Sequence, residues 1–195
     1  MSRPRIGGVV LAAGLSTRLG RPKQLEMLGG ETLVERTVRV ASEAGLAPVI
    51  AVILDGELIP RLQSLGAIPL FNRRSFDGLA TSIHVGVRAA MPHDLDGLVL
   101  MTCDQVALTA DHLRALCHVT EQTTGSLYAG RVGVPAYFPR ASFDALLKLE
   151  GDKGARELLR GVRSFPCEDL ALDVDTEADL ERAKAFVASR GSACG

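Results

Sequence analysis

The chain has 195 residues, and its 22 basic and 23 acidic side chains give a formal net charge of -1. That balance argues against a nucleic acid or an anionic membrane bound through bulk charge. Although 47% of the residues are hydrophobic, no apolar run approaches the roughly 20 residues that cross a bilayer. We therefore expect one domain over residues 1–195, without a membrane or nucleic-acid partner. The N-terminus lacks the long apolar region of a signal peptide, which favours the cytoplasm.

The cysteines and histidines do not form a recognisable metal-binding pattern. Cys103, Cys117, Cys167 and Cys194 include no CxxC pair, and the four histidines form neither HxxxH nor HExxH. We expect these cysteines to be buried or incidental thiols.

Apolar runs of strand length alternate with segments whose apolar residues recur at helical spacing. In chain order, the expected elements of the first part are a strand at 6–13, a helix at 32–44, a strand at 48–54, a helix at 57–65, a strand at 67–71, a helix from Ala80 or Thr81 to Ala90, a strand at 97–103 and a helix at 109–121. Such alternation is typical of an α/β fold, a largely parallel sheet covered by helices.

The pattern changes after Gly125. The segments SLYAG and RVGVPAYFP predict two short strands joined through Gly130 and Gly133, as in a hairpin. The sheet is therefore expected to be mixed. The remaining expected elements are helical pieces at 140–148 and 153–159, a strand at 171–174 and a helix at 177–188.

The stretch VVLAAGLSTRLGRPKQL contains the strongest candidate site. If its apolar start is a central strand, the loop that follows leaves the carboxyl end of that strand, where open α/β sheets bind ligands. Ala12, Ala13 and Gly14 have little or no side chain, so a ligand can reach the backbone and its N–H groups. Arg18 and Lys23 add positive charge, a combination that suits a polyphosphate.

The glycines of this loop do not by themselves identify a ligand. Considered alone, they fit an ordinary turn with solvated basic residues as well as they fit a phosphate site. The spacing of Gly14, Gly20 and Lys23 matches neither GxxxxGK[ST] nor GxGxxG, which disfavours a P-loop ATPase and a Rossmann dehydrogenase.

Carboxylates occur at two further positions of interest. Asp104 directly follows an expected strand, and a carboxylate beside a phosphate site is a natural Mg²⁺ ligand; alternatively, it caps a turn or the helix near Thr109. Asp173 and Asp175 alternate along the expected strand at 171–174, which places both carboxylates on one face. The alternative is an acidic cluster that complements the dipole of the next helix.

The segment FDGLATSIHVG offers a possible nucleotide contact. Gly78 permits a close approach, and Thr81 and Ser82 stand at a helix start where N–H groups are free. Helix capping alone would also account for the two hydroxyls.

The stretch LAAGLSTRLGRPK resembles the LAAGxSxRxGxxK signature of the MobA-like nucleotidyltransferases, particularly the molybdenum cofactor cytidylyltransferases. This resemblance implies a three-layer, Rossmann-like nucleotidyltransferase fold with a mostly parallel mixed sheet. It also implies that the residues of the LAAG segment, Leu11 to Gly14, wrap the nucleotide, and that Arg18 and Lys23 lie on its phosphates.

The likeness extends to other segments of the chain. It makes Asp104 of the CDQ segment a metal ligand and, with Arg18 and Lys23, a catalytic residue, and it makes Asp175 of DVDTEADL the second metal carboxylate. Through a GxxxSxxxG pattern it assigns Gly78 and Ser82 to nucleotide binding. GVP and GDKG also match, with Lys153 a weaker candidate for acceptor contact.

The activity that the resemblance implies is Mg²⁺-dependent transfer of a nucleotide from an NTP to a phosphate-bearing acceptor. CTP and molybdopterin are the first choice, with a molybdoenzyme or chaperone to receive the product; the LAAG spelling favours CTP because guanylyl members tend to carry LAGG. GTP, and a non-catalytic chaperone, are the alternatives, while sugar-1-phosphate activation would usually need a longer chain. Two positions depart from the family pattern, Val106 where proline is usual and Val134 where histidine is typical.

Overall fold

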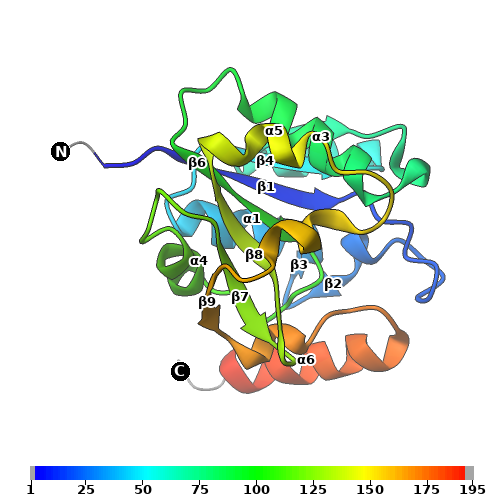
Figure 1. Ribbon diagram of the computed structural model, residues 1–195. Helices are drawn as coiled ribbons and strands as arrows, with labels where there is room; N and C mark the ends of the chain where they lie inside the picture. The colour runs from blue at the N-terminus through cyan, green and yellow to red at the C-terminus, as the bar shows by residue number, and fades with distance from the viewer. Residues whose placement is uncertain (1–2, 192–195) are drawn as a thin grey trace.

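The main sheet has seven strands in the order β5-β4-β1-β6-β8-β7-β9 (Figure 1). The structure is a computed structural model that describes residues 3–191. The strands are β1 (Ile6–Ala12), β4 (Val49–Ile53), β5 (Ile68–Phe71), β6 (Gly97–Thr102), β7 (Thr124–Tyr128), β8 (Arg131–Pro139) and β9 (Arg163–Pro166). Strands β5, β4, β1 and β6 are parallel neighbours, whereas β8 runs antiparallel to both β6 and β7, and β9 runs parallel to β7. The expected mostly parallel mixed sheet is confirmed.

Helices cover both faces of this sheet and give three layers (Figure 1). They are α1 (Leu33–Glu43), α2 (Ile59–Ser64), α3 (Leu79–Ala90), α4 (Ala110–Leu116), α5 (Phe143–Leu146) and α6 (Glu177–Gly191). Alternate residues of β1 face opposite ways: Val10 packs in the core shared with α1, α2 and α4, and Val9 in the core shared with α3 and α5. None of the helices within residues 3–191 has the length and apolarity that a membrane crossing requires.

A third, smaller core fixes the C-terminal helix. Helix α6 lies along the lower edge of the molecule in Figure 1, near the short hairpin formed by β2 (Met27–Leu28) and β3 (Glu31–Thr32). Its Leu180 packs with Leu28, Leu33 and Val106, and Val106 is only 2% exposed. The valine at position 106, where the family pattern has proline, is therefore an apolar core residue in this chain.

In the first half of the chain, the predicted strand bounds agree with the structure to within about a residue, but two helices are shorter than expected. The segment at 57–65 divides into a 3₁₀ turn (Gly56–Leu58) and α2, and the helix expected at 109–121 ends at Leu116. Thr109 caps α4 as expected, since its hydroxyl accepts from the N–H of His112 at 3.2 Å. The β-branched Val119 and Thr120, poor helix formers, lie in the lost C-terminal part.

The prediction for the second half is less accurate. The hairpin of β7 and β8 is confirmed, but its two-residue turn is Ala129–Gly130, both with positive φ, and Gly133 lies inside β8. The helical piece expected at 140–148 is a 3₁₀ turn (Arg140–Ser142) followed by α5, and that at 153–159 is a 3₁₀ helix (Gly154–Leu159).

The strand expected at 171–174 is wrong. A 3₁₀ turn (Glu168–Ala171) occupies its start, and only an isolated antiparallel bridge joins Asp173 to Gln105. Apolar and acidic residues alternate in this segment as they do in a half-buried strand. Apart from the single bridge, however, no strand in the described part of the chain pairs with it. The edge strand β9 went unpredicted because RSFP contains one large apolar residue, Phe165.

Candidate functional site

The loop after β1 turns tightly around Ser16. The carbonyl of Ser16 accepts from the N–H groups of Leu19 at 3.1 Å and Gly20 at 3.0 Å, and its hydroxyl accepts from the N–H of Lys23 at 3.0 Å. Gly20 has φ +76, a conformation that residues with a side chain rarely adopt. Ser16, which the sequence analysis did not single out, therefore fixes where Lys23 leaves the loop.

Backbone donors are exposed along the same loop. Gly14, Leu15 and Thr17 make no hydrogen bond within the described residues, and all three are exposed. Their N–H groups are therefore available to an anion beyond the carboxyl end of β1.

Four charged side chains meet beside this loop. The Nζ of Lys23 donates to Asp104 Oδ2 at 2.6 Å and to Asp175 Oδ1 at 2.8 Å. Arg18 donates to the other oxygen of Asp175, Oδ2, at 2.5 Å. The side chains of Lys23 and Asp104 are each 15% exposed, whereas that of Arg18 is 71% exposed. The structure thus brings together all four charged residues that the sequence analysis assigned to phosphate and metal.

Backbone contacts explain why residues so far apart in the sequence meet. Asp104 follows β6 directly, and its carbonyl accepts from the N–H of Val174 at 3.1 Å. The bridge between Gln105 and Asp173 lies beside this contact. These two backbone contacts hold the segment before Asp175 against Asp104 and Gln105, without the strand that the sequence analysis expected.

The charges perturb one another's protonation. Burial alone would lower the pKa of Lys23, but the ion pairs with Asp104 and Asp175 outweigh it and hold that pKa above its ordinary value. Burial, together with repulsion from Asp104 and Asp175, raises the pKa of the Asp173 carboxyl. Lys23 is thus fully charged at neutral pH and neutralises carboxylates that would otherwise repel each other.

The donor set is suited to a hard divalent cation. Among the described residues no three His, Cys, Asp or Glu side chains form a metal-binding group, but Asp104 and Asp175 each place an oxygen within 2.8 Å of one cationic atom, Lys23 Nζ. Mg²⁺ is commonly bound by one or two carboxylates together with substrate phosphates. These two carboxylates therefore fit a metal that arrives with a polyphosphate.

A cavity of about 570 Å³ surrounds the charged cluster, and we call it the loop cavity. Of the predicted site residues, those that line it are Leu11, Ala12, Ala13, Gly14, Arg18, Lys23, Ser82, Asp104 and Asp175. The sequence analysis missed Phe76, which also lines it and is 72% exposed. Its position in the polar loop after β5, at the carboxyl edge of the sheet, is the signal that could have identified it.

Gly78 has a different role from the one expected. It is buried, is not among the residues that line the loop cavity, and has φ +111. A Cβ atom there would lie 2.7 Å from the backbone carbon and oxygen of Gly151. The glycine thus permits α3 to pack against the turn at Gly151, and the structure gives no sign of contact between Gly78 and the loop cavity.

The start of α3 is also more fully hydrogen-bonded than expected. The N–H of Leu79 donates to Asp152 Oδ1 at 3.2 Å, that of Ala80 to the carbonyl of Gly151 at 3.0 Å, and that of Thr81 to the carbonyl of Gly78 at 3.1 Å. These donors are therefore not free for a ligand, because the 151–152 turn already uses two of them.

Ser82, which lines the loop cavity, is held by a hydrogen bond from a neighbour that the sequence analysis missed. Its hydroxyl is 2.9 Å from the Nδ2 of Asn72, which is 3% exposed and also donates to Thr81. Asn72 directly follows β5, so a buried amide at the carboxyl edge of the sheet orients both hydroxyls of α3.

The adjacent thiol is protected, which gives a testable prediction. Cys103 is 4% exposed, and burial, with a smaller contribution from the neighbouring Asp104, raises the pKa of its thiol to about 12. We expect iodoacetamide at about pH 8 to leave Cys103 unmodified in the folded protein and to label it fully in denaturant, as measured by peptide mass spectrometry. Equal labelling rates in the two states would contradict the buried position.

Comparison with known proteins places this chain in a family. Residues 8–169 match the model of the MobA-like NTP transferase domain. The purine catabolism protein PucB of Bacillus subtilis (strain 168) is 33% identical over 172 residues, covering 82% of this chain and 83% of that protein. A probable molybdenum cofactor guanylyltransferase of Opitutus terrae is 53% identical over 47 residues, covering 24% of this chain and 23% of that protein.

A solved structure is similar over nearly the whole chain. The crystal structure of Rv0371c from Mycobacterium tuberculosis H37Rv has a TM-score of 0.79 and 33% identity, covering 95% of this chain and 100% of that one. A second structure of Rv0371c, in complex with manganese, has a TM-score of 0.74 and 30% identity, covering 93% and 98%. Asp175 lies beyond the family match at 8–169, so its assignment depends on its contacts with Lys23 and Arg18.

Proposed function

Because this chain belongs to the MobA-like NTP transferase family, we propose that it transfers a nucleotide, with the help of a divalent metal, from an NTP to a phosphate-bearing acceptor. The observation that carries the proposal is the meeting of Lys23 with Asp104 and Asp175 beside a loop with unused N–H groups. This cluster places positive charge for phosphates, and carboxylates for a metal, in a single cavity.

In the proposed reaction, an oxygen of the acceptor's phosphate attacks the α-phosphorus of the NTP. The bond from that phosphorus to the bridging oxygen breaks, and pyrophosphate leaves. Because the attacking phosphate is already an anion at neutral pH, the protein needs neither a nucleophile nor a general base. Catalysis then comes from positioning and from stabilising charge on the phosphates.

The chain's own residues have distinct tasks in this scheme. The N–H groups of Gly14, Leu15 and Thr17 hold phosphate oxygens, and Arg18 and Lys23 neutralise the charge that moves to the leaving pyrophosphate. To do so the two cations must move from the carboxylates to the phosphates. Asp104 and Asp175 are then free for the metal.

We propose Mg²⁺ as that metal, held by Asp104 and Asp175. When bound there, such an ion would supply positive charge that stabilises the charge developing on the phosphates. The oxygen-only donor set supports a hard cation, and the existence of a manganese complex of Rv0371c supports a divalent ion.

For the substrates we propose CTP and molybdopterin. The LAAG spelling at Leu11 to Gly14 supports CTP, whereas the short, highly identical match to a probable molybdenum cofactor guanylyltransferase supports GTP as the alternative base. That match supports molybdopterin with either nucleotide.

The test is pyrophosphate release by the purified protein with Mg²⁺, molybdopterin, and CTP, GTP, ATP or UTP in turn. We expect release with CTP and loss of that release in the Asp104→Asn variant, which keeps the side-chain shape but removes the charge. Release with GTP alone would replace CTP by GTP. Mg²⁺-dependent nucleotide binding without release in any mixture would contradict the transferase proposal and favour a nucleotide-binding chaperone.

A further inference from the structure

Gln105 has a buried amide side chain, and the residue is only 5% exposed. Because a buried amide is costly unless it is hydrogen-bonded, its partners show what it holds in place. Its Nε2 group donates to the Val134 carbonyl at 3.0 Å and to the Leu170 carbonyl at 3.4 Å, and its Oε1 accepts from the Thr102 hydroxyl at 3.4 Å. One side chain therefore links the end of β6 to β8 and to the 3₁₀ turn at 168–171.

The backbone beside this amide makes the contacts that bring Asp175 to Asp104. Gln105 pairs with Asp173 in the isolated bridge, and the carbonyl of Asp104 accepts from the N–H of Val174 at 3.1 Å. The segment at 173–175 belongs to no strand of the described sheet, so few backbone contacts fix its position. A shift of Gln105 would therefore move the two carboxylates relative to each other.

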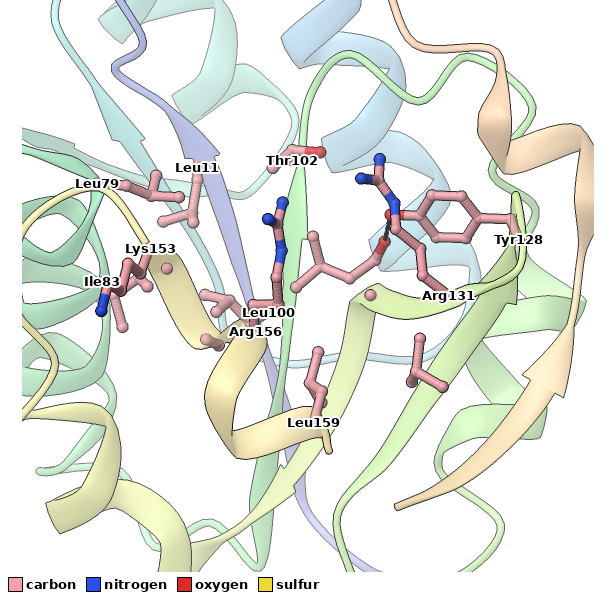
Figure 2. Close-up of a pocket in the computed structure, with 15 residues that line it drawn as sticks. Leu11, Leu79, Ile83, Leu100, Thr102, Tyr128, Arg131, Lys153, Arg156 and Leu159 are labelled. Carbon is pink, nitrogen blue, oxygen red and sulfur yellow. Dashed lines mark hydrogen bonds between the residues drawn. The ribbon is translucent and has the colours of Figure 1, made fainter. Parts of the chain in front are cut away.

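Gln105 lies outside the space that a ligand can occupy. It lines neither the loop cavity nor another cavity, of about 120 Å³, which Val134, Arg131 and Arg156 line (Figure 2). The Val134 carbonyl that it contacts also accepts from the hydroxyl of Tyr128 at 2.9 Å, the dashed line in Figure 2. Any effect of the amide on a metal or a phosphate must therefore act through the residues that it holds.

The proposed movement of Lys23 makes such a link necessary. In the structure the Nζ of Lys23 joins Asp104 to Asp175. When Lys23 turns to the phosphates that connection is lost, and the two carboxylates repel each other until a metal binds them. The hydrogen bonds of Gln105 do not involve Lys23, so they persist during the exchange.

We propose that Gln105 is a positioning residue for the metal, because its amide holds the segment at 173–175 against the end of β6 and keeps Asp104 and Asp175 together when Lys23 leaves them. An uncharged amide suits this task, since it uses both its donor and its acceptor and adds no charge that would compete with the carboxylates. This inference rests on the proposed function, because it concerns the metal of the same reaction.

Mn²⁺ binding without nucleotide tests the proposal, with the full chain carrying Lys23→Met so that the lysine does not compete for the carboxylates. The EPR signal of free Mn²⁺ gives the Kd and the number of sites. Gln105→Met has a side chain of similar length without the hydrogen bonds, and it should raise the Kd by about 10-fold or more. Gln105→Asn keeps the amide but is too short to reach the same carbonyls, so it should raise the Kd as well.

The matched control is Thr124→Val on β7, which removes another buried hydrogen bond, from the Thr124 hydroxyl to the Leu116 carbonyl at 2.7 Å. It should lower the midpoint of urea unfolding and leave the Mn²⁺ Kd within about twofold, because it lies apart from the carboxylates. We expect Gln105→Met to fold, since the Val134 carbonyl keeps its bond from Tyr128. An unchanged Kd in both Gln105 variants, or equal weakening in Thr124→Val, would overturn the inference.

Turnover separates this inference from the proposed function. With Lys23 present, Gln105→Met should raise the Mn²⁺ concentration for half-maximal pyrophosphate release by about 10-fold or more and leave the KM for CTP at saturating Mn²⁺ unchanged. A merely structural residue would lower the amount of active protein without moving that concentration, and this result would overturn the inference alone. Gln105-dependent Mn²⁺ binding without release in any mixture would support the positioning role and overturn the transfer reaction. Absence of Mn²⁺ binding in Lys23→Met would overturn both.

Discussion

Replacing Lys23 by methionine should tighten Mn²⁺ binding in the absence of nucleotide while lowering transferase turnover by about 10² to 10³. Both effects have one cause: in the structure the Nζ of Lys23 is the cation shared by Asp104 and Asp175. Without it, the two carboxylates attract a divalent ion more strongly, whereas the NTP loses a preorganised positive charge. Titration calorimetry with Mn²⁺ and a pyrophosphate-release assay measure the two changes separately.

Arg21→Met is the matched control for this experiment. Arg21 lies on the same loop, but it pairs with Glu26 and Glu177 instead of the metal carboxylates. It should leave both Mn²⁺ affinity and turnover near normal. Weaker Mn²⁺ binding in Lys23→Met, or near-normal turnover, would contradict the role of Lys23 as the cation that pairs with Asp104 and Asp175 and then with the phosphates.

Replacing Gly78 by alanine should destabilise the protein by about 3 kcal/mol or more, the largest stability effect that we expect at the site. Position 78 has φ +111, a region that is costly for any side chain, and the added Cβ would lie 2.7 Å from the backbone of Gly151. Because Gly151 accepts from the N–H of Ala80, the start of α3 must shift, and nucleotide affinity should fall as Ser82 moves with it. Urea unfolding measures the loss of stability.

Gly130→Ala separates strain from overlap. Gly130 also has a positive φ, +69, but nothing lies within 4 Å of its added Cβ. We expect a cost of about 1 to 2 kcal/mol, which is ordinary for alanine in the left-handed conformation. Equal effects at the two positions would contradict the close packing of Gly78 on Gly151.

The parts of the site that could be predicted from the sequence are those encoded locally. Gly14, Arg18 and Lys23 stand within ten residues on one loop, and Asp104 directly follows an apolar strand. Asp175 was predicted as a partner of Asp104 although the strand assigned to it was wrong. Its side chain reaches the site through the contact of Val174 with Asp104, which no local pattern encodes.

Features that depend on tertiary packing could not be predicted. Arg131 and Arg156 belong to a strand and a 3₁₀ helix, and they line one cavity only because that 3₁₀ helix packs against β8. Gly78 was assigned to nucleotide binding through the GxxxSxxxG pattern, together with the close approach that glycine allows. The sequence did not reveal that the approaching group is the backbone of Gly151.

The central claim is that a metal and an NTP displace Lys23 from Asp104 and Asp175. A crystal structure with Mn²⁺ and a non-hydrolysable CTP analogue tests it most directly, because manganese is located by its anomalous scattering. We predict an anomalous peak bound by Asp104 and Asp175, with Lys23 and Arg18 on the phosphates. Manganese bound elsewhere, or Lys23 still between the two carboxylates with nucleotide present, would contradict the account.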